Sequence, residues 1–464
     1  MYHTSIKFLA ILFLAVVTLS SCEDDPKLPD NQLQFESSVA GISSEDESLT
    51  LNMTLSRAVS ADVVVTLSVN GGALVYGTDF TTTPAAVGNM ITLTIPAGET
   101  TSAVTLNKVA GVGFSGDETI VFEVVSIDGS PVPGENSKIS VTFSEITVTS
   151  AAMNIRGGGP TFPNRVFIDL SANRQTAVNR TDWDFGFYTE AGQFKVILNS
   201  ALAMLAKPLD KTDLTAVTAA DTVGWGATLT TDAFSVDNIG YIDDPSGNLG
   251  NLAIDDVSAT ASENKVYIVN RGKDVAGNQR SWKKIRVLRN GDNYTIQYAD
   301  IAATTFQTLE ITRDNSYVFN YVSLDANSAV QPEPEKRKWD IAYTTFMNQT
   351  NLGEGFIPYM FNDFIIQNRE GVQTVQLLVS NVGEYADFDA ADLTGITLGT
   401  AQNTIGSGWR NGGGPSSPPS LRTDRFYLVK DADGNVYKVK FTALTTDGER
   451  GRPAIEYALV SAGS

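Results

Sequence analysis

Trp183-Asp-Phe-Gly-Phe-Tyr188 and Trp339-Asp-Ile-Ala-Tyr343 are two versions of one short block, and they decide how this chain is interpreted. Each is followed about 80 residues later by a second matching block, first Lys265-Val-Tyr-Ile-Val269 and then Arg425-Phe-Tyr-Leu-Val429. Trp is uncommon in this chain, with 5 residues, and both blocks are apolar, aromatic and short, as strands are. The sequence therefore predicts one β-rich unit written twice within 151–464, with halves of about 151–305 and 306–464.

Residues 1–21 are expected to be an export signal and 22–30 an acidic tether. The apolar stretch from Phe8 to Val17 is too short to span a bilayer, and it suits a signal peptide. Leu19-Ser-Ser-Cys22 resembles the bacterial lipobox, which implies a lipid (palmitate) on Cys22. The following Glu23-Asp-Asp25 resembles the signal that sends Bacteroidetes lipoproteins to the outer face of the outer membrane. A surface-facing outer-membrane lipoprotein is expected, and a secreted protein with a stray Cys is the alternative.

Composition excludes several classes of function. The net charge of −20 argues against nucleic acid and anionic headgroups as partners, so the membrane is expected to be touched only through the lipid. The single histidine, His3, lies in the signal, and Cys22 is the single cysteine. The mature chain therefore lacks a Ser-His-Asp triad, a Cys nucleophile, a His-based zinc site and bis-His haem ligation.

Carboxylate-based enzymes survive that exclusion. Asp243-Asp244 and Asp255-Asp256 are the acid pairs that such a hydrolase would use. Successive side chains point apart in extended backbone, however, so neither pair is suited to act as acid and base on one bond. We expect no enzyme activity.

Residues 31–148 alternate apolar and polar side chains with the period of half-buried strands. Gly77-Thr-Asp-Phe80 and Ile95-Pro-Ala-Gly-Glu-Thr100 resemble the Calx-β domain, which implies a seven-stranded immunoglobulin-like sandwich. Some Calx-β domains bind calcium, and the matching loop acids here are Asp79, Asp117 and Glu118. Solvated surface charges are the more ordinary interpretation, so this domain is expected to be a spacer.

Turn signals divide the second region. Arg156-Gly-Gly-Gly-Pro160 marks a boundary loop, and Asn290-Gly291 predicts a hairpin turn. Asp431-Ala-Asp-Gly-Asn435 lies between two strand patterns and is interpreted as a turn in preference to a calcium loop. The apolar stretch 201–206 fits a strand end or a short helix equally well. The whole chain is predicted to be all-β, an N-terminal sandwich followed by the duplicated domain.

The duplicated region resembles the HmuY family of haem-binding lipoproteins. The resemblance rests on Val166-Phe-Ile-Asp-Leu170, the two Trp-Asp blocks, Ile357-Pro-Tyr359 with Asp363-Phe364, and the late hairpins 265–300 and 425–457. It implies an all-β fold that clamps a planar ligand, with haem as the cofactor or cargo. It also implies iron acquisition, with handover to a TonB-dependent outer-membrane receptor as the partner. A non-catalytic adhesion or glycan-binding protein is the alternative.

Without histidine, haem iron would need another axial ligand, and thioether sulfur is one. Met204 and Met360 each lie 21 residues after a block tryptophan, and Met347 is the third candidate. Filling of apolar cores is the ordinary role of methionine and remains the alternative. Trp183 and Trp339 themselves are expected to be core residues. The candidates for a ligand-contacting face are Tyr188, Tyr343, Tyr359, Trp225 and Trp409.

Overall fold

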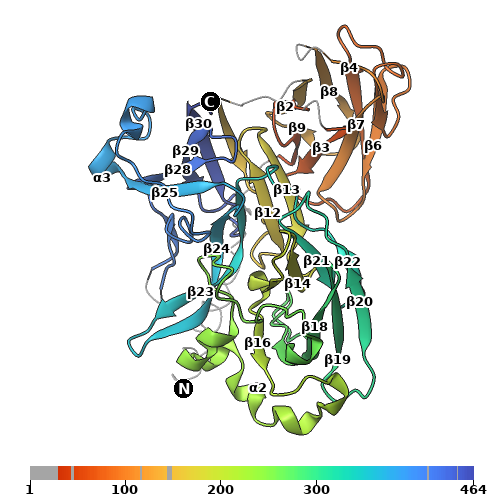
Figure 1. Cartoon of the computed structure of the whole chain (residues 1–464). Coiled ribbons are helices and arrows are strands. Elements are labelled where there is room, and N and C mark those ends of the chain that lie inside the picture. The colour runs from red at the N-terminus through yellow and green to blue at the C-terminus, as the bar shows by residue number, and fades with distance from the viewer. Residues whose placement is uncertain are drawn as a thin grey trace, which may run out of the picture.

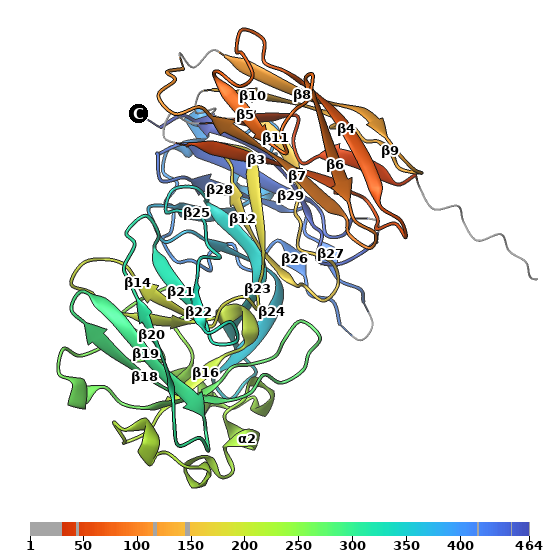
Figure 2. The same ribbon diagram turned by 90° about the vertical axis from the view of Figure 1, so that its right-hand side faces the viewer.

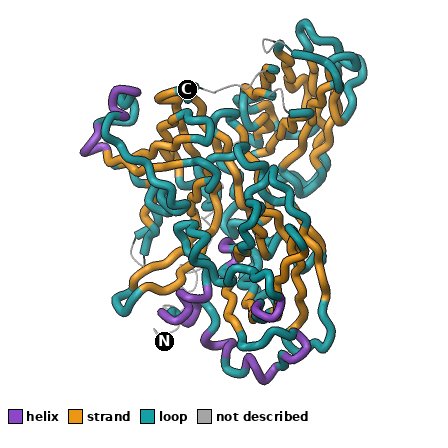
Figure 3. Tube along the Cα trace, in the orientation of Figure 1, coloured by secondary structure: helices purple, strands orange, loops and turns teal. Residues whose placement is uncertain are grey.

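Three β bodies make up the part of the chain that the structure, a computed structural model, describes (Figures 1 and 3). The described residues are 30–42, 46–114, 118–143, 149–414, 417–446 and 448–463. The signal, Cys22 and Asp117 lie outside them. Among the described helices, none is both long enough and apolar enough to cross a membrane.

The N-terminal body is a sandwich of two five-stranded sheets, ordered β5-β7-β3-β1-β9 and β2-β10-β8-β4-β6. Strand β3 illustrates the pattern that gives each sheet one buried face. Its Leu and Met side chains are buried at every second position, and the polar side chains between them are more exposed. The expected immunoglobulin-like sandwich is confirmed, with short extra strands at its edges. Its strands are β1 Gln32–Phe35, β2 Val39–Gly41, β3 Ser48–Leu55, β4 Val63–Asn70, β5 Phe80–Thr83, β6 Met90–Ile95, β7 Thr101–Lys108, β8 Thr119–Ile127, β9 Val132–Pro133 and β10 Lys138–Thr142.

The second body, called the first lobe, packs sheet β15-β14-β21-β22 on sheet β16-β17-β18-β19-β20. Phe185, Val269 and Val322 are among the buried side chains that the two sheets share. The strands are β14 Phe185–Tyr188, β15 Val196–Leu198, β16 Leu205–Pro208, β17 Tyr267–Asn270, β18 Lys283–Asn290, β19 Asn293–Asp300, β20 Gln307–Ile311, β21 Phe319–Ser323 and β22 Ser328–Val330.

The third body, called the second lobe, packs sheet β13-β12-β23-β24 on sheet β11-β30-β29-β28-β25. Ile168, Tyr343 and Tyr457 lie in its shared core. The strands are β11 Ser150–Asn154, β12 Asn164–Asp169, β13 Arg174–Asn179, β23 Ile341–Asn351, β24 Phe356–Gln367, β25 Gln373–Leu378, β28 Arg425–Lys430, β29 Val436–Ala443 and β30 Ala454–Ser461, with a short ribbon of β26 Arg410–Asn411 and β27 Ser420–Leu421.

The two lobes exchange strands between the sequence halves. Strands β11, β12 and β13 open the first half but pair with β30 and β23 of the second. Strands β20, β21 and β22 open the second half but pair with β19 and β14 of the first. Each lobe is therefore completed by the first three strands of the other half, so the halves of the sequence are not the packing units of the molecule.

The two turns predicted from the sequence are present in the structure. Asn290 pairs with Asn293 across the hairpin between β18 and β19. Asp431 Oδ1 accepts hydrogen bonds from the backbone N–H groups of Asp433 and Asn435, so the Asp-x-Asp-Gly stretch is a turn between β28 and β29. The undecided stretch 201–206 holds both forms, a 3-10 turn followed by the start of β16.

Short helices fill residues 209–266 between β16 and β17, a stretch called the helical segment. The helices of the described residues are η1 Ser200–Leu202, η2 Leu214–Ala216, η3 Ala219–Thr222, α2 Trp225–Thr228, η4 Thr231–Ala233, η5 Val236–Tyr241, η6 Ala261–Glu263, α3 Val379–Val382 and η7 Ala390–Leu393.

The outer part of the β23–β24 hairpin, residues 347–360 and called the arm, projects from the second lobe beside the helical segment (Figure 1). Met347, at its base, packs with Leu214 and Ile242 of that segment. At the tip, a methyl group on Gly355 would lie 3.1 Å from Val236 Cγ1. The arm and the helical segment thus form one continuous surface.

The sandwich lies against the second lobe (Figure 2). Arg156 Nη1 and Glu36 Oε1 form an ion pair of 2.5 Å across the contact. Nearby, Asn173 donates from its side-chain amide to the Ser37 hydroxyl. Burial outweighs the attraction of Arg156 and raises the pKa of Glu36 to about 7.

Candidate functional site

The two lobes meet through one sheet of each, the sheet that contains β14 in the first lobe and the sheet that contains β23 in the second. The faces in contact are those directed away from each lobe's own core, and a cavity lies between them. Trp183 and Tyr321 come from the first lobe, Trp339 and Phe346 from the second, and all four line the cavity. Its volume is about 50 Å³. The two block tryptophans are thus buried, at 1% and 5% exposure, as expected of core residues, but their core is the contact between lobes.

The aspartate after each tryptophan holds an equivalent backbone group. Asp184 Oδ2 accepts from the N–H of Leu324 at 2.8 Å, and Asp340 Oδ2 accepts from the N–H of Leu170 at 2.8 Å. In both lobes this ties the Trp-Asp turn to the neighbouring exchanged strand. The repeated block is therefore a structural joint.

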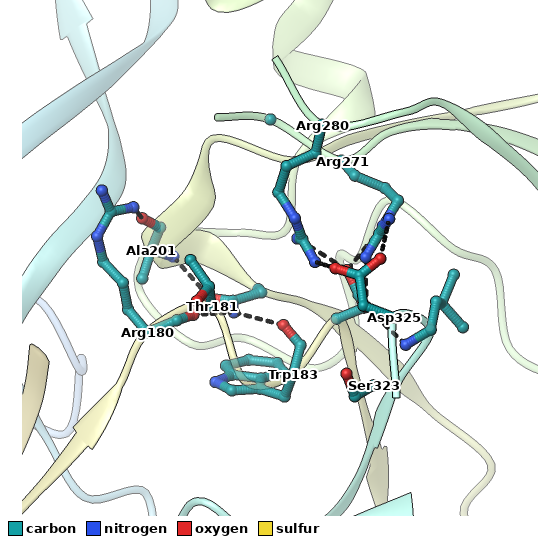
Figure 4. A network of polar contacts seen from close by, with 12 residues as sticks. Arg180, Thr181, Trp183, Ala201, Arg271, Arg280, Ser323 and Asp325 are labelled. Carbon is teal, nitrogen blue, oxygen red and sulfur yellow. Dashed lines mark hydrogen bonds and ion pairs between the residues drawn. The ribbon is translucent and has the colours of Figure 1, made fainter. Parts of the chain in front are cut away.

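The charges around the two aspartates differ. Asp184 is fully buried, and Arg271 contacts both of its carboxylate oxygens at 2.9 Å. Arg280 also lies 2.9 Å from Asp184, and both arginines reach Asp325 (Figure 4). Hydrogen bonds from Arg271 and Arg280 lower the pKa of Asp325 to about 2.

Asp340 has only acids nearby in the corresponding place. The residue that follows β17 is Arg271, whereas the residue that follows β28 is Asp431. Burial, together with the nearby carboxylates of Asp169 and Asp431, raises the pKa of Asp340 well above its ordinary value. The pKa of Asp340 is thus raised in a site without a cation, while Asp184 is the centre of an ion-pair network.

The three candidate methionines lie at one end of the lobe contact. Met204 and Met347 both line the cavity and are 1% and 3% exposed. Met360 faces Met347 across the β23–β24 ladder and is half-buried. Methionine spacing alone had paired Met204 with Met360; the structure instead brings Met204 and Met347 to one cavity.

Haem does not fit between Met204 and Met347 in this arrangement. Pockets that enclose a ligand of drug size measure roughly 300–1,000 Å³, and this cavity is far smaller. The segments that carry Met204 and Met347 are also joined by a hydrogen bond, because the Thr345 hydroxyl donates to the Ala201 carbonyl at 2.8 Å. The chemistry of thioether sulfur suits haem iron, but of the three candidates Met360 is the one that is not fully buried.

The aromatic candidates divide into two groups. Tyr359 is exposed on the arm, while Tyr188 and Trp225 are half-buried. Lys207 Nζ lies 4.3 Å from the centre of the Trp225 ring, in a cation–π contact. These three residues remain available to a ligand-contacting surface.

Two expectations for exposed aromatic side chains are wrong. Trp409 is fully buried and stacks on Phe441 with ring centres 4.2 Å apart, because its Gly-rich loop folds into the core of the second lobe. Tyr343 is fully buried as well, and its hydroxyl donates to Asp363 Oδ1 at 2.6 Å. A glycine-rich flank indicated a loop correctly but did not indicate where the indole pointed.

The calcium candidates gain no support. Asp79 Oδ2 accepts from the N–H of Val75 at 2.7 Å, which is a turn contact. Within the described ranges, no group of three or more His, Cys, Asp or Glu side chains is placed to hold a metal ion. In each pair of adjacent acids, one member has a structural contact. Asp243 accepts hydrogen bonds from backbone N–H groups, and Asp256 forms an ion pair with Lys195.

Sequence reasoning missed the polar residues of the cavity. Arg165, Arg369, Glu333 and Asp243 all line it. A charged residue in the middle of the apolar strand Asn164-Arg-Val-Phe-Ile168 was the available signal, because every position of β12 after the first is buried.

Comparisons with known proteins identify a family for the region of the two lobes. The family model described as HmuY protein matches residues 161–318 and again 315–457. A solved protein of Bacteroides vulgatus, described as HmuY-like and heme-binding, is 11% identical with a TM-score of 0.20, over 68% of this chain and 93% of that one.

Two further solved structures are similar. The Calx CBD1 domain is 16% identical with a TM-score of 0.22, over 25% of this chain and 97% of that domain. A two-domain protein of unknown function from Bacteroides fragilis is 10% identical with a TM-score of 0.20, over 39% of this chain and 70% of that one. No curated protein matches the chain.

Proposed function

Because the chain belongs to the HmuY family, we propose that it is a surface-anchored lipoprotein that binds haem and passes it to an outer-membrane transporter. Cys22 is the proposed lipid attachment site, and the acidic tether after it is the proposed surface signal. The sandwich is the proposed spacer between the anchor and the lobes. A TonB-dependent receptor is the proposed recipient of the haem.

The arm and the helical segment are the proposed haem-binding surface. Phe234 and Phe356 are 56% and 54% exposed, and Val236 beside them is 45% exposed. Apolar side chains exposed this widely in a group are typical of binding surfaces. Haem is flat and largely apolar, so it matches this surface better than it matches the small cavity between the lobes.

Met360 is the proposed iron ligand. It lies four residues after Phe356 on β24 and therefore on the same face of the strand. Met347 is opposite it but buried in the packing with the helical segment. The single observation that carries the proposal is this half-buried thioether beside an exposed aromatic tip.

Hemin titration of the purified mature protein tests the proposal. A thioether ligand favours ferrous iron, so we expect a shifted Soret band that sharpens on reduction with dithionite. Met360→Ala should weaken hemin binding and change the reduced spectrum. Met90→Ala is the matched control, because Met90 is 43% exposed on the sandwich.

Each result has a clear meaning. Wild-type protein with no Soret shift would show that haem is not the ligand. A normal shift that Met360→Ala leaves unchanged would remove the arm methionine from the proposal. A loss that appears equally in Met90→Ala would show a nonspecific effect of removing an exposed methionine.

A glycan-binding role is the second candidate, and a separate observation favours it. A groove of about 530 Å³ lies between the sandwich and the second lobe. Amide and hydroxyl side chains dominate it, among them Gln32, Gln34, Asn154, Gln175 and Thr446. Such groups pair with sugar hydroxyls. A glycan array would identify a ligand, and Gln32→Ala, which removes an exposed amide of the groove, should then weaken its binding.

A further inference from the structure

The cavity between the lobes contains a buried arginine that lacks a carboxylate partner. Arg165 enters from the second lobe on β12 and is 6% exposed. Its Nε atom has no hydrogen-bond partner. The guanidinium lies 5.4 Å from the centre of the Trp183 ring, and that cation–π contact supplies only part of what water would. Burial lowers the pKa of Arg165, which measures the cost of holding its charge there.

A second arginine, Arg369, lines the same cavity. Its Nε donates to Gln402 Oε1 at 3.1 Å, and its Nη1 donates to the Gly247 carbonyl at 3.3 Å. Both acceptors are neutral. Burial lowers the pKa of this guanidinium too. Among the ion pairs of the described residues, none involves Arg165 or Arg369, so the second lobe brings to the contact two guanidinium groups without a direct carboxylate partner.

The acids that the first lobe supplies are already occupied. Asp243 accepts from the N–H groups of Leu198 and Ala253 at 2.7 and 3.1 Å. The Tyr321 hydroxyl donates to Glu333 Oε2, and the Trp339 indole N–H is directed at the same carboxylate. Burial raises the pKa of Glu333 to about 7 and that of Asp243 to about 6.

Asp243 and Glu333 therefore line the cavity without pairing directly with either arginine. A buried guanidinium without a direct partner is strongly unfavourable, and a bound anion would supply that partner.

Size and donor chemistry narrow the class of anion. A water molecule needs about 10–15 Å³ on the same measure, so about 50 Å³ admits a group of three or four heavy atoms. Guanidinium forks match the two oxygens of a carboxylate. Trp339 also lines the cavity, but its indole N–H is directed at the Glu333 carboxylate.

We propose that the cavity between the two lobes binds the carboxylate group of a small organic anion, held by Arg165 and Arg369. The bound carboxylate lies at the contact between the lobes and gives the two guanidinium groups the direct partner that the protein itself does not provide. This site is separate from the thioether on the arm and does not depend on haem being the ligand. The carboxylate comes from a free small acid or from a propionate of a porphyrin.

Acetate is the probe for the site itself. Calorimetric titration of the mature protein with acetate, at constant ionic strength with chloride as the balancing anion, should give saturable binding. Urea unfolding at one hundred times the measured dissociation constant should raise the ratio of folded to unfolded protein about 100-fold. No saturable heat and no change in unfolding would overturn the proposal. An equal response to added chloride would overturn the assignment to carboxylate.

Substitutions locate the binding. Arg165→Met keeps the aliphatic stem against Trp183 but removes the guanidinium, so the response to acetate should be lost. Arg289→Met is the matched control, because Arg289 is an exposed arginine on the first lobe and its loss changes the net charge equally. If Arg165→Met does not fold, Arg369→Met is expected to lose the response in the same way. An acetate response retained in a folded variant of either kind would contradict the site.

Hemin and its dimethyl ester distinguish the two sources of the carboxylate. If acetate weakens hemin binding and the ester binds more weakly than hemin, the carboxylate is a propionate. If acetate binds but hemin and its ester are unaffected by it, the carboxylate is that of a free acid. The failure of haem binding on the arm would leave the acetate result intact, so the two proposals fail separately.

Discussion

Replacing Asp184 with asparagine should destabilise the protein strongly, whereas the same change at Asp340 should be almost neutral. Asp184 is fully buried and faces Arg271, which is 1% exposed, through two contacts of 2.9 Å. Removing one member of a buried ion pair costs about 3–5 kcal/mol. Asp325 still partners both arginines after the change, so we expect the lower end of that range, about 3 kcal/mol.

Asp340 occupies the equivalent position but takes part in none of the ion pairs of the described residues, and burial and the nearby acids raise its pKa well above its ordinary value. Asparagine is then a close substitute that still accepts from the N–H of Leu170. We expect a change below about 1 kcal/mol, as for a substitution that preserves a hydrogen bond. The two variants carry the same substitution and differ only in which copy of the Trp-Asp block contains it.

Urea unfolding followed by tryptophan fluorescence measures both changes at pH 7. A difference of about 3 kcal/mol corresponds to a change of roughly 150-fold in the unfolding equilibrium. Asp184→Asn combined with Arg271→Gln should recover part of the loss, because no unpaired buried charge remains at that position. Equal losses in the two single variants would refute the inference that only the Asp184 copy depends on an ion pair.

Two other predictions concern backbone and pH. Gly272→Ala should prevent normal packing of the first lobe, because a methyl group there would lie 1.6 Å from the Leu202 carbonyl oxygen. Gly277 has a similar positive φ but open space around it, so Gly277→Ala should cost about 1 kcal/mol in the same unfolding assay. The free energy of unfolding should fall as pH rises from 5 to 7. Glu333 has a folded-state pKa of about 7 and an unfolded-state pKa of about 4.5. Its contribution to stability is therefore complete below the unfolded-state pKa and is lost as pH rises through the folded-state pKa. Glu333→Gln should flatten that decline when urea midpoints are compared at pH 5, 6 and 7, and an unchanged decline would contradict the role given to this carboxyl.

Much of the fold was predictable from local patterns. Alternating burial in the sandwich strands, the Asn290-Gly291 turn and the Asp431–Asn435 turn all follow from residues close in sequence. The repeated Trp-Asp block also indicated the duplication that the family model matches twice. The exchange of strands was not predictable, because the pairing partner of β12 lies more than 150 residues away and any exposed strand edge has the same local pattern.

The candidate site was predictable only in part. Trp183 and Trp339 were expected to be buried, and they are. Trp409 was expected on a binding surface because glycines flank it, yet its ring found a flat partner in Phe441. Arg165 and Glu333 become visible as a pair only when the two lobes meet, since they lie 168 residues apart in the chain.

The reciprocal pairing of β12 with β23 and of β21 with β14 has a consequence for the origin and dissection of this molecule. A polypeptide with one copy of the unit would leave an open sheet edge, and two such polypeptides would close each other's sheets, as in a domain-swapped homodimer. The present chain has the form of that intertwined pair fused into one gene product. Fusion makes the association intramolecular, so it holds however dilute the protein becomes. Cutting the gene between the copies would therefore yield fragments that recombine, not two free-standing domains.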